Sequence, residues 1–314
     1  MIMSTPLRDT QMLAIDHILC PVDFSEASQH AIAYALAIAR WSGAAVSALH
    51  VCDPMFVPAM SVAGPRADDV DVEMARRRAA AASLVECAGA HEVKVGVAVE
   101  AGDPARQILE HADRHETNLI VMGTHGLSGF ERLIIGSVAE KVLRKARCPV
   151  LTVPPRVHTA ATLPFKHVLC AIDFSSASLE ALNYAGALAQ QSQARLHLLH
   201  VVQWPWDEPP APAPHDLPPE QAVALGEYRR YVEASAMARL AALRRERIPE
   251  GVEAVPRIVH GKAYVQIVRV AAETCVDLIV LGVQGRNAAD VAVFGSTANQ
   301  VVRAAACPVL TVRQ

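Results

Sequence analysis

Short runs of consecutive apolar residues recur along the chain, and longer stretches with apolar residues at helical spacing separate them. In the first half the runs lie near Ile18 to Val22, Ala45 to Val51, Val93 to Glu100, Leu119 to Met122 and Val150 to Val153. Runs without polar alternation are typical of strands buried on both faces of a parallel sheet. The alternation of strands with helical stretches therefore predicts a doubly wound α/β fold with right-handed crossovers.

The same pattern occurs twice. The sequence HILCPVDFS at His17 to Ser25 is matched by HVLCAIDFS at His167 to Ser175, an offset of 150 residues. CPVLTV occurs at Cys148 and again at Cys307, an offset of 159 residues. We therefore predict two tandem flavodoxin-like or Rossmann-like domains, each with a doubly wound, five-stranded parallel sheet. The predicted division is residues 1–153, a linker at 154–166, and residues 167–314.

Each copy also contains a long helix rich in alanine and arginine, predicted near Ala67 to Ala90 and Glu220 to Arg247. The second of these follows Gln203 to Pro219, which holds seven of the chain's twenty prolines and is predicted to be a surface loop. Ser25 is the expected cap of the first helix, and Asp103-Pro104 the expected start of the third.

Composition and charge exclude several classes of partner. The 314 residues are 52% hydrophobic and 19% charged, and the net charge of −3 gives no electrostatic case for nucleic acid or an acidic membrane. Residues 1–14 show no secretory signal, and the apolar run Ala31 to Ala39 is too short to span a membrane. The seven cysteines include no C-x-x-C pair, and Cys20 and Cys170 are expected to be small buried hydrophobes. We expect a reducing, cytoplasmic location.

A glycine-bearing segment follows the fourth predicted strand of each copy. Its spacing is Gly123-x-x-Gly126, nine residues, then Gly136-Ser137, and the second copy repeats this spacing from Gly282. In an open parallel sheet, ligands bind beyond the carboxyl ends of the strands, where the strand order reverses. Glycine lets the backbone approach a ligand closely, and the amides and dipole at the start of the next helix favour an anion. The anion expected is phosphate.

Other residues around this crevice suit a nucleotide. Asp23, at the end of the first strand, is placed to accept hydrogen bonds from ribose hydroxyls or an adenine amine. Val51, at the end of the second strand, could offer its backbone N–H and C=O to a purine edge. Ser137 as a helix cap, with Glu140 three residues later, is predicted to form a capping box.

These residues resemble the motif of the universal stress protein family in its tandem form, over nearly the whole chain. The family's nucleotide-binding members carry G-x2-G-x9-G-[S/T] on an adenine nucleotide alpha hydrolase-like fold, and both copies satisfy this spacing. The resemblance implies ATP with Mg²⁺, its triphosphate on the glycine loop, and an internal pseudo-dimer paired through the last strands. Further dimerisation is left open. The implied contacts are Asp23, Val51, Gly123, Gly126, Gly136, Ser137 and Val138, and in the second copy Asp173, Val201, Gly282, Gly285, Gly295, Ser296 and Thr297.

The second copy departs from the first in its loop. It lacks the counterparts of His125, Ser128-Gly129 and Arg132, it carries Asp290 near the expected phosphate, and its helix lacks the glutamate of the capping box. A nearby like charge and weaker pre-organisation therefore rank the second site below the first. Trp204 and Trp206 are interpreted as cover for the proline-rich loop, with a lid over the second site as the alternative.

The remaining chemistry-bearing residues have simpler interpretations. His50 and His200 are expected to lie under the sheet end rather than bind metal, and His111 and His115 to share a solvated helix face. Asp23 could also compete with Ser25 for the helix cap. No catalytic residue is predicted, because no positioned general base is recognisable. The sequence thus predicts a nucleotide-dependent stress-response regulator, with a slow ATPase and a nucleotide-independent interaction module as alternatives.

Overall fold

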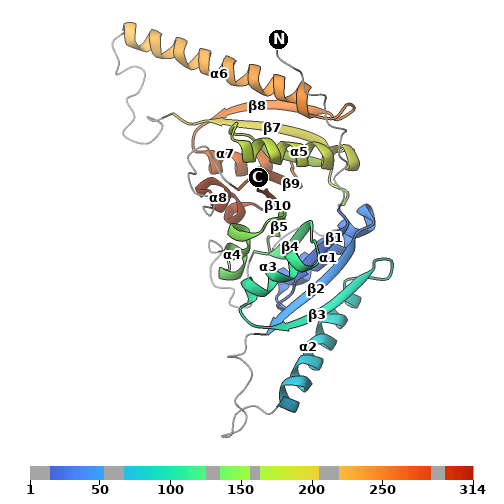
Figure 1. The fold of residues 1–314 in the computed structure, drawn as a ribbon. Helices are drawn as coiled ribbons and strands as arrows, with labels where there is room; N and C mark the ends of the chain where they lie inside the picture. Colours follow the sequence, from blue (N-terminus) through green and yellow to red (C-terminus); the bar gives the residue numbers. More distant parts are fainter. Residues whose placement is uncertain are drawn as a thin grey trace, which may run out of the picture.

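A computed structural model of the protein describes residues 15–52, 67–124, 135–155, 163–204, 219–283 and 294–313. Within these ranges the strands form one sheet of ten, in the order β3-β2-β1-β4-β5-β10-β9-β6-β7-β8 (Figure 1). The first copy comprises β1 (His17–Pro21), α1 (Glu26–Ser42), β2 (Ala45–Cys52), α2 (Ala67–Cys87), β3 (Val95–Ala101), α3 (Pro104–Arg114), β4 (Leu119–Gly123), α4 (Ser137–Lys145) and β5 (Val150–Val153). The second comprises β6 (His167–Ala171), α5 (Ser176–Ser192), β7 (Arg195–Val202), α6 (Pro219–Arg247), β8 (Ala254–His260), α7 (Ala263–Glu273), β9 (Leu278–Gly282), α8 (Ser296–Ala304) and β10 (Val309–Val312).

The predicted doubly wound α/β architecture is confirmed, with small differences where elements begin and end. β3 begins at Val95 rather than Val93, because the Val93 N–H is bonded to the Ala90 carbonyl in the preceding turn. Ser25 caps α1 through a hydrogen bond accepted from the Ser28 N–H. Asp103 caps α3 with proline in its first turn, also as predicted.

The two copies join through their last strands. β5 and β10 run antiparallel, with Leu151 opposite Leu310 and Thr152 opposite Val309, while every other strand pair in the sheet's described part is parallel. The hydroxyl of Thr152 donates to the Val309 carbonyl at 3.1 Å, and that of Thr311 donates to the Val150 carbonyl at the same distance. This arrangement relates the copies by a pseudo-two-fold axis near Leu151 and Leu310.

Strand residues divide between two core layers, one on each face of the sheet. Ile18 and Cys20 lie in the layer covered by α1, α2, α5 and α6, whereas Leu19, between them, lies in the layer covered by α3, α4, α7 and α8. Cys20 and Cys170 are 0% exposed, so they are the buried hydrophobes predicted, and burial raises the pKa of each thiol far above its ordinary value. Each fully buried leucine or isoleucine in these layers stabilises the fold by about 1.5–3 kcal/mol.

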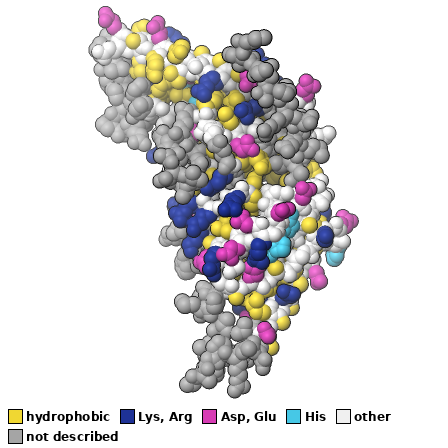
Figure 2. Space-filling model, in the orientation of Figure 1, with side chains coloured by type: hydrophobic (Ala, Val, Ile, Leu, Met, Phe, Trp, Pro, Cys, Tyr) yellow, Lys and Arg dark blue, Asp and Glu magenta, His cyan; other side chains and the backbone are white. Residues whose placement is uncertain are grey.

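Helix α6 extends beyond the sheet at one end of the molecule (Figure 1). Hydrophobic side chains gather over its outer part (Figure 2), where Val223, Tyr228 and Tyr231 are exposed. Among the described residues, no helix is both long enough and apolar enough to cross a membrane.

Candidate nucleotide-binding sites

The candidate site of the first copy lies at the carboxyl end of the sheet, where the strand order reverses between β1 and β4. The segment that leaves β4 returns to its own starting point: the Thr124 N–H donates to the Val153 carbonyl at 3.2 Å, and the Gly136 N–H donates to the Thr124 carbonyl at 2.8 Å. Val283 and Gly295 repeat both bonds in the second copy, at 2.9 and 2.8 Å. The residues between these anchors, Gly126, Gly285, His125, Ser128-Gly129, Arg132 and Asp290, lie outside the described ranges.

The predicted capping box is wrong. Gly136, not Ser137, is the N-cap of α4, and no side chain makes a cap hydrogen bond. Ser137 is the first helical residue, so its hydroxyl is not positioned to accept from the amide that an N-cap serine would reach. The first helical hydrogen bond of α4 runs from the Glu140 N–H to the Gly136 carbonyl. The N–H groups of residues 137–139 come before it, so they have no acceptor within the helix.

The start of α8 in the second copy has the same geometry. Gly295 is its N-cap with φ −57° and ψ 139°, against −57° and 141° for Gly136, and again no side chain caps the helix. The absence of the glutamate from the second copy therefore does not distinguish the two helix starts as candidate anion-binding sites. Each presents uncapped amides and the positive end of a helix dipole, an arrangement that attracts anions.

Gly123 and Gly282 have a packing role that sequence reasoning did not find. A Cβ on Gly123 would lie 2.8 Å from the Cβ of Ala27, and one on Gly282 would lie 2.7 Å from the carbonyl carbon of Ala177. Both glycines thus allow the first turn of α1 or α5 to lie against the end of the neighbouring strand. Their predicted contact with a ligand stays a prediction.

Asp23 does not compete with Ser25 for the helix cap; it holds that cap in place. Its Oδ1 accepts from the Ser25 N–H at 3.0 Å and from the Ser25 hydroxyl at 2.5 Å, while Ser25 Oγ accepts from the Ser28 N–H at 3.2 Å. Asp173 and Ser175 repeat these contacts at 2.9 and 2.5 Å. In the first copy, no described residue makes a hydrogen bond to Asp23 Oδ2, which leaves that oxygen to accept from a ligand.

The residue after each aspartate has an uncommon backbone conformation. Phe24 has φ 66° and Phe174 has φ 65°, in the left-handed region that bulky residues rarely adopt. The turn brings each aromatic ring onto the histidine at the end of the next strand, with centroids 4.6 Å apart for Phe24 and His50. Strain of this kind is concentrated at functional sites. The repeated sequence DFS was the available signal, but it does not reveal the backbone angle.

His50 and His200 lie beneath the crevices, as predicted. The Nδ1 of His50 donates to the Val22 carbonyl at 2.8 Å and that of His200 donates to the Ile172 carbonyl at 2.7 Å, because a carbonyl can only accept. Burial lowers the pKa of His50 below its ordinary value.

The backbone of Val51 faces the crevice. β1 ends opposite Leu49, and the Val22 N–H donates to the Leu49 carbonyl at 2.8 Å. Backbone groups two residues apart in a strand point to the same side, so the N–H and C=O of Val51 face the β1 side beyond the end of that strand. Val201 lies in the same way after Leu199, whose carbonyl accepts from the Ile172 N–H at 2.8 Å.

The predicted solvated face of α3 is wrong for His111. This side chain is 4% exposed, and its Nδ1 bonds to Glu100 on β3 at 2.8 Å, while Arg114 contacts the same carboxylate at 2.8 Å. Burial lowers the pKa of His111. His115 remains exposed, with its ring 4.3 Å from that of His111. Within the described residues, no group of histidine, cysteine or acidic side chains could hold a metal ion.

The second copy has contacts between α6 and the strands that the described part of the first copy lacks. Trp204 is 7% exposed and donates its indole N–H to His260 Nδ1 at 3.2 Å, while His260 Nε2 lies 3.0 Å from Glu233 on α6. Trp204 therefore packs α6 against β8, and whether it covers the proline-rich loop or acts as a lid stays a prediction; Trp206 lies outside the described ranges. Arg239 of α6 places its guanidinium 3.8 Å from the ring centroid of Phe174, a contact between distant segments that could not be predicted from sequence.

The fold and the repeated crevice define a tandem, doubly wound α/β protein. A sequence model described as "Universal stress protein family" matches residues 14–154 and 164–313, so the chain belongs to the universal stress protein family.

Individual relatives match one copy. Universal stress protein MJ0531 of Methanocaldococcus jannaschii is 35% identical over 136 residues, which are 43% of this chain and 80% of that protein. Universal stress protein YxiE of Bacillus subtilis is 32% identical over 146 residues, covering 43% of this chain and 97% of its own. A solved universal stress protein structure from Archaeoglobus fulgidus matches 96% of this chain and 99% of its own, with a TM-score of 0.66 and 24% identity. At that identity the likeness is evidence for the fold alone.

Proposed function

We propose that the protein binds an adenine nucleotide, ATP with Mg²⁺, in one or both crevices and acts as a nucleotide-dependent regulator of a stress response in the cytoplasm. One observation carries the proposal: each helix that follows a glycine segment begins at an uncapped glycine, across the strand-order reversal from a half-buried aspartate. The doubling of this arrangement in copies of divergent sequence argues against a chance helix start.

Each part of a nucleotide has a counterpart among the described residues. The phosphates would accept from the amides of Ser137, Val138 and Ala139, and the helix dipole would favour their charge. The carboxylate of Asp23 would accept from ribose hydroxyls or the adenine amine, and the backbone of Val51 would meet the purine edge. Asp173, Val201, Ser296 and Thr297 would do the same in the second copy, with Gly126 and Gly285 shaping the two loops.

A regulatory role is favoured over catalysis by the state of the titratable groups that the structure describes at the first crevice. His50 is buried and already donates to a backbone carbonyl, and one oxygen of Asp23 is held by Ser25. Phosphoryl transfer to water requires a group that positions the attacking water. Nucleotide binding that alters the shape or partners of the protein needs no such group.

The decisive experiment is calorimetric titration with ATP and Mg²⁺, and with AMP, of the wild type and of Gly136→Asp and Gly295→Asp. Aspartate is a favoured N-cap residue and the φ of both glycines suits it, so these variants should fold at least as well as the wild type. Their new carboxylate would occupy the helix amides and repel phosphate, and each should lose one binding event. Gly226→Asp is the matched control, since nothing lies within 4 Å of a Cβ built there.

The result that would overturn the proposal is saturable ATP binding that survives in the double variant, or no binding in a wild type shown to be free of carried-over nucleotide. Release of inorganic phosphate above the rate of the double variant would instead favour the slow ATPase. Mass spectrometry of small molecules released on denaturation identifies which nucleotide the purified protein carries.

A further inference from the structure

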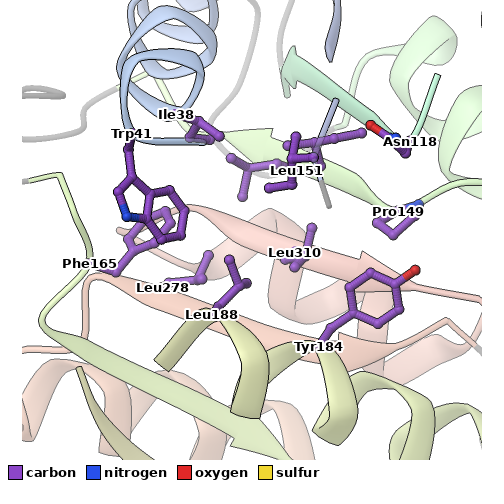
Figure 3. A pocket seen from close by; sticks show the side chains of 12 residues that line it. Ile38, Trp41, Asn118, Pro149, Leu151, Phe165, Tyr184, Leu188, Leu278 and Leu310 are labelled. Atoms are coloured by element: carbon purple, nitrogen blue, oxygen red, sulfur yellow. The ribbon is translucent and has the colours of Figure 1, made fainter. Parts of the chain in front are cut away.

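A cavity lies at the junction of the two copies, away from both nucleotide crevices. Its volume is about 60 Å³ and it is partly open to solvent. Leu151 of β5 and Leu310 of β10, which face each other across the pseudo-two-fold axis, form its floor, and Ile38 of α1 and Leu188 of α5 line its sides (Figure 3). The cavity therefore occupies the space between α1 and α5, over the antiparallel strand pair.

The lining is contributed in equivalent pairs by the two copies. At the repeat offsets of 150 and 159 residues the pairs are Ile15 with Phe165, Ile38 with Leu188, and Leu119 with Leu278. The symmetry is broken at Trp41, whose counterpart is Gln191, and at Ile15, which is smaller than Phe165. Ile15 is the smaller side chain of its pair, so it leaves space at the junction that a phenylalanine would fill.

The chemistry of the lining selects against charge. None of the lining residues is ionised at neutral pH, and most are aliphatic or aromatic. A charged ligand would lose its hydration without finding a partner, which is costly in an apolar site.

Two polar groups lie at opposite ends of the cavity. Figure 3 shows Trp41 beside Phe165 at one end and Tyr184 at the other, with leucine side chains between them. Neither the Trp41 indole N–H nor the Tyr184 hydroxyl makes a hydrogen bond with any described residue. By contrast, the Oδ1 of Asn118 is already bound by the N–H groups of Asp16 and His17. A ligand acceptor could therefore meet the Tyr184 hydroxyl without displacing an existing bond.

We propose that this junction cavity is a binding site for a small, neutral, amphipathic molecule, such as a short-chain alcohol or the alkyl end of a larger neutral compound. An apolar cavity of about 150 Å³ holds benzene. A space of about 60 Å³ thus holds an alkyl group of only a few heavy atoms. The hydroxyl of the ligand meets Tyr184 at one end of the cavity, and the alkyl part lies on Leu151 and Leu310.

The test is titration of the full chain with ethanol, 1-propanol, 1-butanol and 1-hexanol, followed by the methyl NMR signals of the leucines. Each added methylene that enters the cavity should tighten binding about fourfold. Because the cavity is small, this gain should stop before 1-hexanol. Saturable shifts confined to the lining leucines are the expected result.

Ile15→Phe fills the cavity with the side chain that the second copy already uses at this position. It should weaken the binding of 1-butanol at least tenfold. Ile15→Leu, which adds no bulk, is the matched control and should bind as the wild type does. Leu188→Phe fills the same space from the other side, should Ile15→Phe fail to fold. Tyr184→Phe, which removes only the hydroxyl, should weaken the binding of 1-butanol roughly two- to tenfold, the loss of affinity expected for one hydrogen bond.

Three results would overturn the proposal. The first is shifts that are scattered over the protein or do not saturate. The second is equal binding by the wild type and a folded Ile15→Phe or Leu188→Phe variant. The third is binding that appears only after deletion of residues 2–14, since that outcome would assign the cavity to the protein's own N-terminal segment.

Discussion

The two copies share the parts that would hold phosphate and differ in the long helix that packs on the two outer strands of each copy. The N-cap glycines have nearly identical backbone angles, and the aspartate–serine contacts agree to 0.1 Å. The first copy carries α2, with Arg77 paired to Glu73 at 2.7 Å, whereas the second carries the longer α6, with Arg239 on Phe174 and Glu233 near the Trp204–His260 pair. Duplication therefore kept the backbone of both helix starts and changed the long helix of each copy, so α2 and α6, together with the two glycine loops, are where a difference in ligand preference can arise.

The largest loss of stability is expected at the glycines that end β4 and β9, where the two copies have the same close packing. Gly123→Ala and Gly282→Ala each drive a Cβ to within 3.0 Å of α1 or α5. Overpacking of this kind costs about 1–3 kcal/mol. Denaturant unfolding should show similar losses for both variants. Gly226→Ala, in an open stretch of α6, should have no such cost, and a large difference between the two site variants would break the equivalence of the copies.

The serine hydroxyl that donates to the aspartate is common to both copies, and its removal tests whether it positions that aspartate. Ser25→Ala and Ser175→Ala should each lower the free energy of unfolding by about 1 kcal/mol through loss of the helix cap. Each should also weaken nucleotide at its own crevice, because the carboxylate loses its 2.5 Å contact. Threonine at either position restores the hydroxyl. If affinity fell in the alanine variants and was not restored by threonine, the positioning role would be rejected.

A smaller change, in nucleotide affinity, should distinguish the second copy from the first. Arg239→Ala removes the guanidinium from Phe174, a contact worth about 0.5–1 kcal/mol at an exposed site, and should alter nucleotide affinity only in the second crevice. Ala80 is the repeat-equivalent residue of α2, and Ala80→Arg is the reciprocal variant. Calorimetric titration of both checks the assignment. Equal changes of nucleotide affinity at both crevices would show that Arg239 does not distinguish the second crevice from the first.

The smallest effect concerns acid stability. Burial lowers the pKa of His111, so the unfolded chain binds a proton more readily than the folded one. Stability from this residue is therefore present near neutral pH and is lost as the pH falls below the ordinary histidine pKa of about 6.5. Val270 and Val259 occupy the positions of His111 and Glu100 in the second copy. His111→Val should flatten the pH dependence of urea unfolding between about pH 5 and 7, whereas His91→Val, at an exposed position, should not.

Elements fixed by local chemistry could be predicted from the sequence. The apolar runs located the strands, and Ser25 and Asp103-Pro104 located two helix starts, because each signal lies within a few residues of its effect. The capping box failed because the choice between Gly136 and Ser137 as N-cap depends on backbone angles, which residue types alone do not show. His111 was misplaced because its partner Glu100 lies on a strand that precedes its helix, and helical spacing alone does not show what faces the helix. The packing role of Gly123 was missed because a glycine needed for helix packing looks the same in sequence as one that approaches a ligand.

The antiparallel pairing of β5 with β10 has a consequence for how such a protein can evolve. A chain with one copy would need a second chain to cover that strand edge, and the assembly would separate on dilution. In this chain both strands belong to one molecule, so their encounter is intramolecular and independent of protein concentration. Identical halves are then no longer required. One half can acquire a longer helix or lose a loop residue without imposing the same change on the other.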